Sequence, residues 1–331
     1  MRRQAPASAF TGALARGLLR LALRAGAVAA IVGAVCFALV RALPGDAAYR
    51  IAAGRYGYDI VDTNAADAVR RELGLDRPWW NQLWTWMEDL AHGRLGRSMV
   101  SGDPVVEELA HQLGHTLQLS LAAWLLALAV GLAVGTAVAL SNRRWLDRLL
   151  TSVGLALRAT PAFVIALVLA TWLAVHAGLL PAAGHGDAQH FVLPSLTLAL
   201  GLAAGLAQVT RHTTGHVLST PYVAFARTKG LAPPWVLLRH VMRNSAVPVA
   251  TYSGTQLVLL VEGVVVVESF FAWPGIGHAL VHALIARDIP MVQGTALCMG
   301  LLFVCWSALV DAVCWLLDPR LQGHTVSDSR K

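Results

Sequence analysis

The sequence predicts an all-α polytopic membrane protein with six transmembrane helices. Apolar residues make up 56% of the chain and charged residues only 14%, and the mean hydropathy is +0.57. A soluble domain carries roughly 25% charged residues. Six runs are apolar enough, and near enough to the roughly 20 residues that a spanning helix requires, to cross the bilayer. They are Ala25–Leu43, Thr116–Leu140, Pro161–Leu180, Leu193–Val209, Ala246–Phe271 and Thr295–Leu317.

Basic residues indicate how these spans are oriented. Arginine and lysine gather before the first span, after the second, after the fourth and after the sixth, and the chain has a net charge of +7. The basic residues occur in every second segment between spans, so these segments lie on the same side of the membrane. The positive-inside rule places that side in the cytoplasm. We therefore expect both termini in the cytoplasm. The same distribution argues against nucleic acid as a partner.

The spans divide the chain into successive segments. We expect a cytoplasmic segment over residues 1–24, a first span over 25–43, and an extracytoplasmic segment over 44–115 that carries most of the acidic residues. A core over 116–317, with a cytoplasmic loop at 210–245, and a cytoplasmic tail over 318–331 follow. The first apolar run is alternatively a cleaved signal peptide, but Leu43-Pro44-Gly45-Asp46 is no small-x-small cleavage site.

Proline and glycine mark the helices of the cytoplasmic loop. Pro221 suits the first turn of a short helix, and Gly230 suits its end because glycine takes the left-handed C-cap conformation at little cost. Ala232-Pro233-Pro234 then prevents continuation. A second helix is predicted over about Trp235–Asn244.

Two other stretches carry local signals. Arg158-Ala159-Thr160-Pro161 predicts a kink or a helix start, because proline removes a backbone donor. The extracytoplasmic segment is rich in tryptophan, which predicts an interfacial belt or the core of a small cap. A docking surface for another protein is the alternative. The tryptophans are Trp79, Trp80, Trp84 and Trp86.

Several linked motifs occur in order along the chain. They are Leu43-Pro44-Gly45-Asp46, Arg71-Glu72-Leu73-Gly74-Leu75-Asp76-Arg77-Pro78, Ala226-Arg227-Thr228-Lys229-Gly230-Leu231, Arg239-His240-Val241-Met242-Arg243-Asn244, Val266-Val267-Glu268, Phe271-Ala272-Trp273-Pro274-Gly275, and Asp311 followed by Asp318-Pro319-Arg320. With them the chain resembles, over nearly its whole length, the inner-membrane permease of an ABC importer. The closest resemblance is to the dipeptide, oligopeptide and nickel branch, and the motif residues Glu268, Pro274, Gly275, Asp311 and Asp318 carry part of it.

This resemblance implies an architecture and a set of partners. The fold would be that of a type I-like ABC importer permease, forming half of a translocation pore. The partners would be a second homologous permease subunit, two ATP-binding subunits and an extracytoplasmic solute-binding protein, all at a bacterial inner membrane. The implied solute is a di- or oligopeptide, with nickel chelates or other small solutes as alternatives.

The resemblance also assigns a role to residues 217–244. This loop would insert its short helix into a groove of the ATPase, with Tyr222, Val223 and Phe225 as apolar anchors and a cationic end that complements the helix dipole. The triplet before the glycine reads Ala224-Phe225-Ala226, without the glutamate of the EAA motif. A basic helix lying on anionic lipid is the alternative. The expected ATPase-coupling residues are Tyr222, Phe225, Ala226, Arg227, Lys229 and Gly230.

The sequence lacks an ATP-binding motif of its own. No segment matches GxxxxGK[ST], so we expect no cofactor bound by this chain, with ATP and Mg used by partner subunits. The chain is then a transport subunit rather than an enzyme. A membrane enzyme and a self-contained secondary transporter are the rivals, but Tyr252-Ser253-Gly254 lacks the fuller context of an intramembrane serine protease.

Polar residues within the fifth span predict a solute path. A carboxylate such as Glu262 costs about 2.5–3.5 kcal/mol in the hydrocarbon, so it should face water or a partner. At about 100° per residue, Thr255, Glu262 and Ser269 share nearly one helical face. This face is the candidate pore lining, and a protonated Glu262 bonded to a neighbouring helix is the alternative.

Histidines raise the question of a metal site. His185 and His190 lie in one outer loop, and His278 and His282 lie four residues apart on an outer helix predicted after the Pro274-Gly275 turn. No cysteine or acidic cluster completes a ligand set with them. We therefore predict no metal site.

Overall fold

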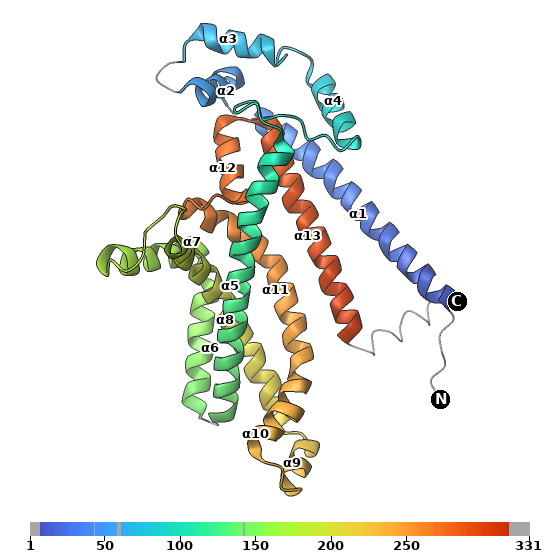
Figure 1. The fold of residues 1–331 in the computed structure, drawn as a ribbon, viewed down its shortest axis with the longest axis vertical. Helices are drawn as coiled ribbons and strands as arrows, with labels where there is room; N and C mark the ends of the chain where they lie inside the picture. The colour runs from blue at the N-terminus through green and yellow to red at the C-terminus, as the bar shows by residue number, and fades with distance from the viewer. Residues whose placement is uncertain (1–6, 43, 58–60, 142, 318–331) are drawn as a thin grey trace. The chain divides into compact units, whose positions relative to one another are not determined.

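A computed structural model of the chain describes residues 7–42, 44–57, 61–141 and 143–317 (Figure 1). The regular elements among these residues are helices, apart from one isolated bridge between Arg97 and Pro104. The chain divides into two compact units, residues 1–114 with 275–308 and residues 115–274 with 309–331. Each unit therefore combines segments that are distant in the sequence.

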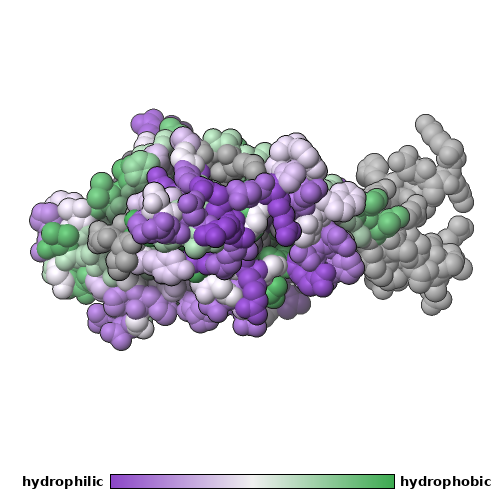
Figure 2. Space-filling model, turned by 90° about the horizontal axis from the view of Figure 1, so that it is seen from above, coloured by the Kyte–Doolittle hydropathy of each residue, from purple (hydrophilic) through white to green (hydrophobic). Residues whose placement is uncertain are grey.

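The first unit contains the N-terminal helix, the short helices after it and most of the last two helices. Its elements are α1 (Ala7–Ala42), α2 (Ala47–Tyr56), α3 (Thr63–Glu72), α4 (Trp79–Ala91), the start of α5 (Val105–Ser141), α12 (Ile276–Ala286) and most of α13 (Ile289–Leu317). Seen from the side of α2 to α4, hydrophilic side chains cover much of the surface (Figure 2). This agrees with a segment that lies in water.

Short-range capping defines the helices of this segment. The Asp46 carboxylate accepts a hydrogen bond from the Ala48 amide at 2.9 Å, and Asp62 accepts one from the Ala65 amide at 2.8 Å. Each therefore satisfies one of the amides that a helix start leaves unpaired. Helices α2 and α3 then bury Ile51 and Val69 in a small core.

A close approach at a glycine joins α4 to α1. A Cβ atom built on Gly33 of α1 would lie 2.1 Å from the ring of Trp86, which is 9% exposed. Any larger residue at this position would displace the indole. By contrast, Trp79, Trp80 and Trp84 on the same helix are between 51% and 74% exposed, so the tryptophans divide into one packing residue and an exposed group.

The turn between α12 and α13 explains part of the Pro44-Gly45 motif. Arg287 takes a left-handed conformation, and its guanidinium donates to the Gly45 carbonyl at 2.7 Å and to the Pro44 carbonyl. The neighbouring Asp288 accepts hydrogen bonds from the Ser98 hydroxyl and from the Met99 amide at 3.1 Å. The motif thus anchors the end of α1 to a turn more than 200 residues away in the sequence.

The second unit contains the rest of α5 and the helices up to α11. They are α6 (Arg144–Ala159), α7 (Ala162–Leu169), the π-helix η1 (Ala170–His176), the 3-10 helix η2 (Ala188–Phe191), α8 (Val192–Leu218), α9 (Pro221–Thr228), α10 (Pro233–Val236), the π-helix η3 (Leu237–Met242) and α11 (Arg243–Phe270). Its core buries Leu119, Leu193, Val264 and Phe271 almost completely.

Small residues bring the long helices of this unit together. A Cβ atom on Gly131 would lie 2.5 Å from the Cβ of Leu206, and one on Gly135 would lie 2.5 Å from the Ala207 carbonyl oxygen. Close backbone approach of this kind is typical of membrane helices, where packing rather than hydrophobic burial drives association. Helices α5 and α8 therefore meet through glycine.

Four helices are long and apolar enough to cross a membrane among the residues described. They are Leu21–Leu39, Val105–Ser141, Ala188–Leu218 and Ile289–Val310, and a fifth results if Arg144–Ala159 and Ala162–His176, bent by 104°, form one broken span. The break predicted at Pro161 is confirmed. Six spans remain a prediction, and the run expected at Ala246–Phe271 lies on α11, which ends at Phe270 with Phe271 as its C-cap.

The second helix predicted for the 217–244 loop has different bounds. It was expected over Trp235–Asn244, separate from the following span, but it begins at Pro233 and continues through η3 into α11 without a break. Pro233 and Pro234 occupy the first helical positions, where a missing amide costs nothing,. Pro248 lies inside α11. A proline removes one backbone hydrogen bond, but the helix continues because its neighbouring turns are intact.

Candidate functional site

Residues 217–244, the loop predicted to be cytoplasmic, form a short hairpin between two long helices. Helix α9 follows α8 after a turn at Ser219 and Thr220, and α10 follows α9 after residues 229–232. Figure 1 shows α9 and α10 together at the end of α8 and α11. The loop therefore projects as a unit built on two long helices.

A glycine ends α9 as the sequence predicts. Gly230 has a φ of +77°, and its amide donates to the Arg227 carbonyl at 3.0 Å. Lys229 precedes it as the C-cap and donates to the Phe225 carbonyl at 3.1 Å. Apart from Gly230 and its two chain neighbours, no heavy atom of the described residues lies within 4 Å of the position where a Cβ on Gly230 would stand. The backbone conformation alone, rather than crowding, therefore favours glycine here.

The hairpin has a small apolar core of its own. Val223 and Ala226 are 0% and 6% exposed, and they contact Val217 at the end of α8 and Val236 and Val241 on the return path. Val223 was expected to anchor a partner together with Tyr222 and Phe225. The structure places Val223 and Ala226 against the loop itself, where they hold α9 in position.

The opposite face of α9 carries exposed aromatic and basic side chains. Tyr222 is 43% exposed and Phe225 is 61% exposed. The Lys229 ammonium lies 4.7 Å from the centre of the Phe225 ring, and Arg227 is exposed in the last turn. Large exposed aromatic side chains beside cations are typical of residues that anchor a protein partner.

The candidate pore residues lie on α11 in different environments. Thr255 is exposed and its hydroxyl donates to the Thr251 carbonyl at 3.1 Å, whereas Ser269 is half-buried and donates to the Val265 carbonyl at 2.9 Å. The side chain of Glu262 lies outside the described residues, as do those of Asp311 and Asp318. The shared face therefore stays a prediction.

A groove on the second unit runs along another face of α11. It has a volume of about 330 Å³ and is lined there by Gln256, Leu260 and Gly263, none of which the sequence singled out. The Gln256 amide donates to the Tyr252 hydroxyl at 2.5 Å. A polar pair four residues apart inside an apolar run is the signal that would have found it.

Glu268 of the family motif is completely buried. Its carboxylate accepts a hydrogen bond from the Thr116 hydroxyl of α5 at 2.7 Å. Glu268 thus joins α11 to α5, a role that no sequence spacing indicated because the partner is 152 residues away. Pro274 and Gly275 follow the end of α11, and Gly275 is the N-cap of α12.

The histidines fall into separate groups. His278 and His282 lie on α12 with ring centres 4.4 Å apart, whereas His185 contacts the rings of His115 and Trp273, each at 4.8 Å. Within the described ranges, no three histidine, cysteine, aspartate or glutamate side chains gather as a metal site would require.

Ser253 of α11 packs against α5. It is 1% exposed, and its hydroxyl oxygen accepts a hydrogen bond from the Trp124 indole at 2.8 Å. A serine nucleophile needs a base to take its proton. This contact instead assigns Ser253 to helix packing.

Comparison with known families decides the class of the chain. Residues 129–323 match the family described as the inner membrane component of binding-protein-dependent transport systems, and residues 14–120 match the N-terminal part of such membrane components. The chain belongs to this permease family. The permease is therefore a multi-pass inner-membrane protein of an ABC importer, in a family that works with ATP-binding and solute-binding components.

Individual relatives extend over most of the permease. The glutathione transport system permease protein GsiC of Escherichia coli strain K12 is 37% identical over 292 residues, which cover 88% of this chain and 94% of the relative. The protein of the same name from Shigella dysenteriae serotype 1 shows the same values. A crystal structure of an amino acid ABC transporter with histidines covers 63% of this chain and 93% of its own, at 16% identity and a TM-score of 0.49.

Proposed function

We propose that this permease forms half of the pore of an ATP-driven importer for small peptides and is coupled to its ATPase subunits through residues 217–244. The observation that carries the coupling role is the exposed Tyr222 and Phe225 on a helix whose other face is fixed by its own core. A rigid helix whose aromatic side chains dock into a groove of the ATPase can transmit movement between the ATPase and the membrane helices. ATP and Mg would be used by the partner subunits, because the sequence has no P-loop.

The full assembly would contain a second homologous permease, two ATP-binding subunits and an extracytoplasmic solute-binding protein. Six spans, with both termini in the cytoplasm, would place the 217–244 loop beside the ATPases and the 44–115 segment on the solute-binding side. Alternating access then follows from the ATP-driven closure of the ATPases and the tilting of the helices attached to α9. The pore would be lined by the face of Thr255, Glu262 and Ser269.

Small peptides are the favoured solutes because of the relatives. The similar GsiC proteins are described as glutathione transport permeases, and glutathione is a tripeptide. The motifs at 226–231, 239–244 and 271–275 support the same peptide branch. Nickel chelates or other small solutes are the alternative.

An uptake experiment separates these solutes. The permease is co-expressed with its paired permease and ATP-binding subunits, reconstituted in vesicles and supplied with the solute-binding protein. Saturable ATP-dependent uptake of labelled glutathione or dipeptides, competed by unlabelled peptide but not by nickel chelates, is the expected result. Uptake of nickel alone would contradict the peptide assignment, and uptake without ATP would contradict the importer.

A further inference from the structure

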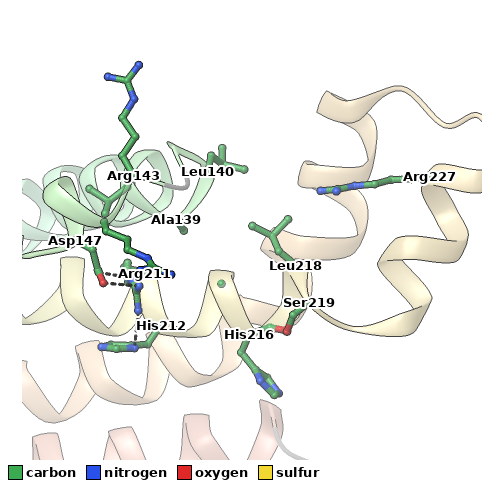
Figure 3. A pocket seen from close by; sticks show the side chains of 13 residues that line it. Ala139, Leu140, Arg143, Asp147, Arg211, His212, His216, Leu218, Ser219 and Arg227 are labelled. Atoms are coloured by element: carbon green, nitrogen blue, oxygen red, sulfur yellow. Dashed lines mark hydrogen bonds and ion pairs between the residues drawn. The ribbon is translucent and has the colours of Figure 1, made fainter.

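A basic pocket lies at the base of the cytoplasmic loop, within the second unit. It has a volume of about 570 Å³ and lies where the end of α5, the start of α6, the end of α8 and helix α9 meet (Figure 3). The titratable groups that line it are Arg143, Arg144, Asp147, Arg211, His212, His216 and Arg227. Four arginines against one aspartate make it a site for an anion.

The single carboxylate in the pocket is already neutralised. The Arg211 guanidinium contacts both oxygens of Asp147, at 2.6 and 2.7 Å, and Figure 3 shows these contacts and a further one to His212. This pairing is bidentate and leaves little of the Asp147 charge for other cations. It also fixes Arg211 at the wall of the pocket.

The remaining arginines keep their charge free for a ligand. Within the described part of the chain, Arg143, Arg144 and Arg227 have no carboxylate partner. Figure 3 shows Arg227 extending from α9 toward Leu218, on the opposite side of the space from Asp147. Arginine binds phosphate oxygens through two parallel N–H donors. A group of arginines therefore suits a phosphate better than a cation that acts as a single point charge.

Aliphatic side chains complete the wall and indicate an amphiphile. Val138, Leu140 and Leu218 line the same pocket as the arginines, and Leu140 is 48% exposed. Directly after the pocket arginines, Trp145 and Leu149 on α6 are 58% and 51% exposed. Exposed tryptophan and leucine next to arginine are typical of the boundary between lipid headgroups and acyl chains.

We infer that the pocket binds the phosphate group of an anionic phospholipid, with the arginines around the headgroup and the aliphatic rim along its chains. Basic pockets between membrane helices on the cytoplasmic side bind such headgroups. Because Arg227 belongs to α9, a bound lipid would contact the coupling helix as well as α6. The orientation rests on the proposed topology, but lipid binding itself is measured without transport.

Lipid counting by native mass spectrometry tests the inference. The permease in its purified complex is stripped of lipid and then titrated with phosphatidylglycerol or with phosphatidylcholine. Wild-type complex should bind phosphatidylglycerol in preference, and the double variant Arg143→Gln/Arg144→Gln should bind it about tenfold or more weakly. Arg148→Gln removes an exposed arginine of α6 that does not line the pocket, so it serves as the matched control and should bind normally.

Two further arms distinguish the sources of the anion. Inorganic phosphate should compete with phosphatidylglycerol only at much higher concentration, because it lacks the acyl chains that the rim contacts. Equal affinity for inorganic phosphate, equal binding of both lipids, or equal loss in Arg148→Gln would overturn the inference. So would a double variant that binds lipid normally but loses its ATP-binding subunits, because the pocket would then be a protein interface. Whether or not the pocket binds lipid, the transport function is tested separately by the uptake experiment.

Discussion

Gly230 is the residue whose backbone conformation matters most for the proposed coupling to the ATPase. Its φ of +77° lies in the left-handed region, and nothing crowds a side chain there. We expect Gly230→Val to introduce a strain on the order of 1–2 kcal/mol, because a β-branched residue opposes that conformation. Displacing the end of α9 should lower ATP-dependent uptake while expression stays normal.

Gly230→Asn is the control for that change. Asparagine enters the left-handed region more readily than other non-glycine residues, so this variant adds a side chain of similar bulk without the same strain. Uptake should stay near the wild-type rate. If valine and asparagine reduce uptake equally, the conformation of Gly230 does not matter and the argument fails.

Phe225 tests the exposed face of α9. It is 61% exposed and has no role in the core of the loop, so its substitution should leave the fold intact. Phe225→Asp should reduce co-purification of the ATP-binding subunits at least tenfold, since truncating a central aromatic anchor costs about 2 kcal/mol or more. Phe225→Leu keeps an apolar side chain and should reduce it less. Unchanged co-purification in the aspartate variant would show that α9 is not the docking element.

At the scale of elements, the contact between α1 and α4 depends on one glycine. Gly33→Ala should push the Trp86 indole aside and cost about 1–3 kcal/mol, as overpacking does,. The expected outcome is faster trypsin cleavage of the segment between α2 and α5. A Cβ on Gly26 of the same helix meets no other part of the described chain within 4 Å beyond the neighbouring helix backbone, so Gly26→Ala should leave cleavage unchanged. Equal protection of both variants would mean that the tryptophan does not hold α4.

Local signals predicted the helix ends, because each depends on the backbone of one residue. Pro161, Gly230 and Gly275 end or begin helices where the sequence indicated. The continuous helix from Pro233 to Phe270 was not predicted, since proline at the first helical positions and proline inside a helix look alike in sequence. Only the hydrogen bonds of the surrounding turns distinguish the two.

The residues of the candidate site also divide into those that local sequence could predict and those that depend on distant contacts. Exposed Tyr222 and Phe225 could be anticipated from the family motif, but the burial of Val223 could not, because it depends on Val236 and Val241 returning beside α9. Likewise Glu268 accepts a hydrogen bond from a threonine 152 residues away, so the spacing of residues in the sequence could not identify its partner. Contacts between distant segments are what a single sequence cannot supply.

At the scale of the whole molecule, the arginine distribution predicts a topology. In a cysteine-free background, single cysteines at Ser141 and Ala224 should resist an impermeant reagent added outside intact cells, whereas one at Gly102 should react. Ala224 and Gly102 are exposed in the structure, so their reactivity reports the side of the membrane. Outside labelling of the cysteine at Ala224 would place the 217–244 loop on the wrong side.

The most direct measurement of the central claim is ATP hydrolysis by the complete assembly in lipid vesicles. With wild-type permease, solute-loaded binding protein should raise the hydrolysis rate severalfold above the rate without it, because the permease carries the signal to its ATPases. With Phe225→Asp or Gly230→Val the stimulation should be lost, even in vesicles where the assembly is intact. A hydrolysis rate that is independent of the loaded binding protein in the wild-type assembly, or stimulation that both variants retain in full, would contradict coupling through the 217–244 loop.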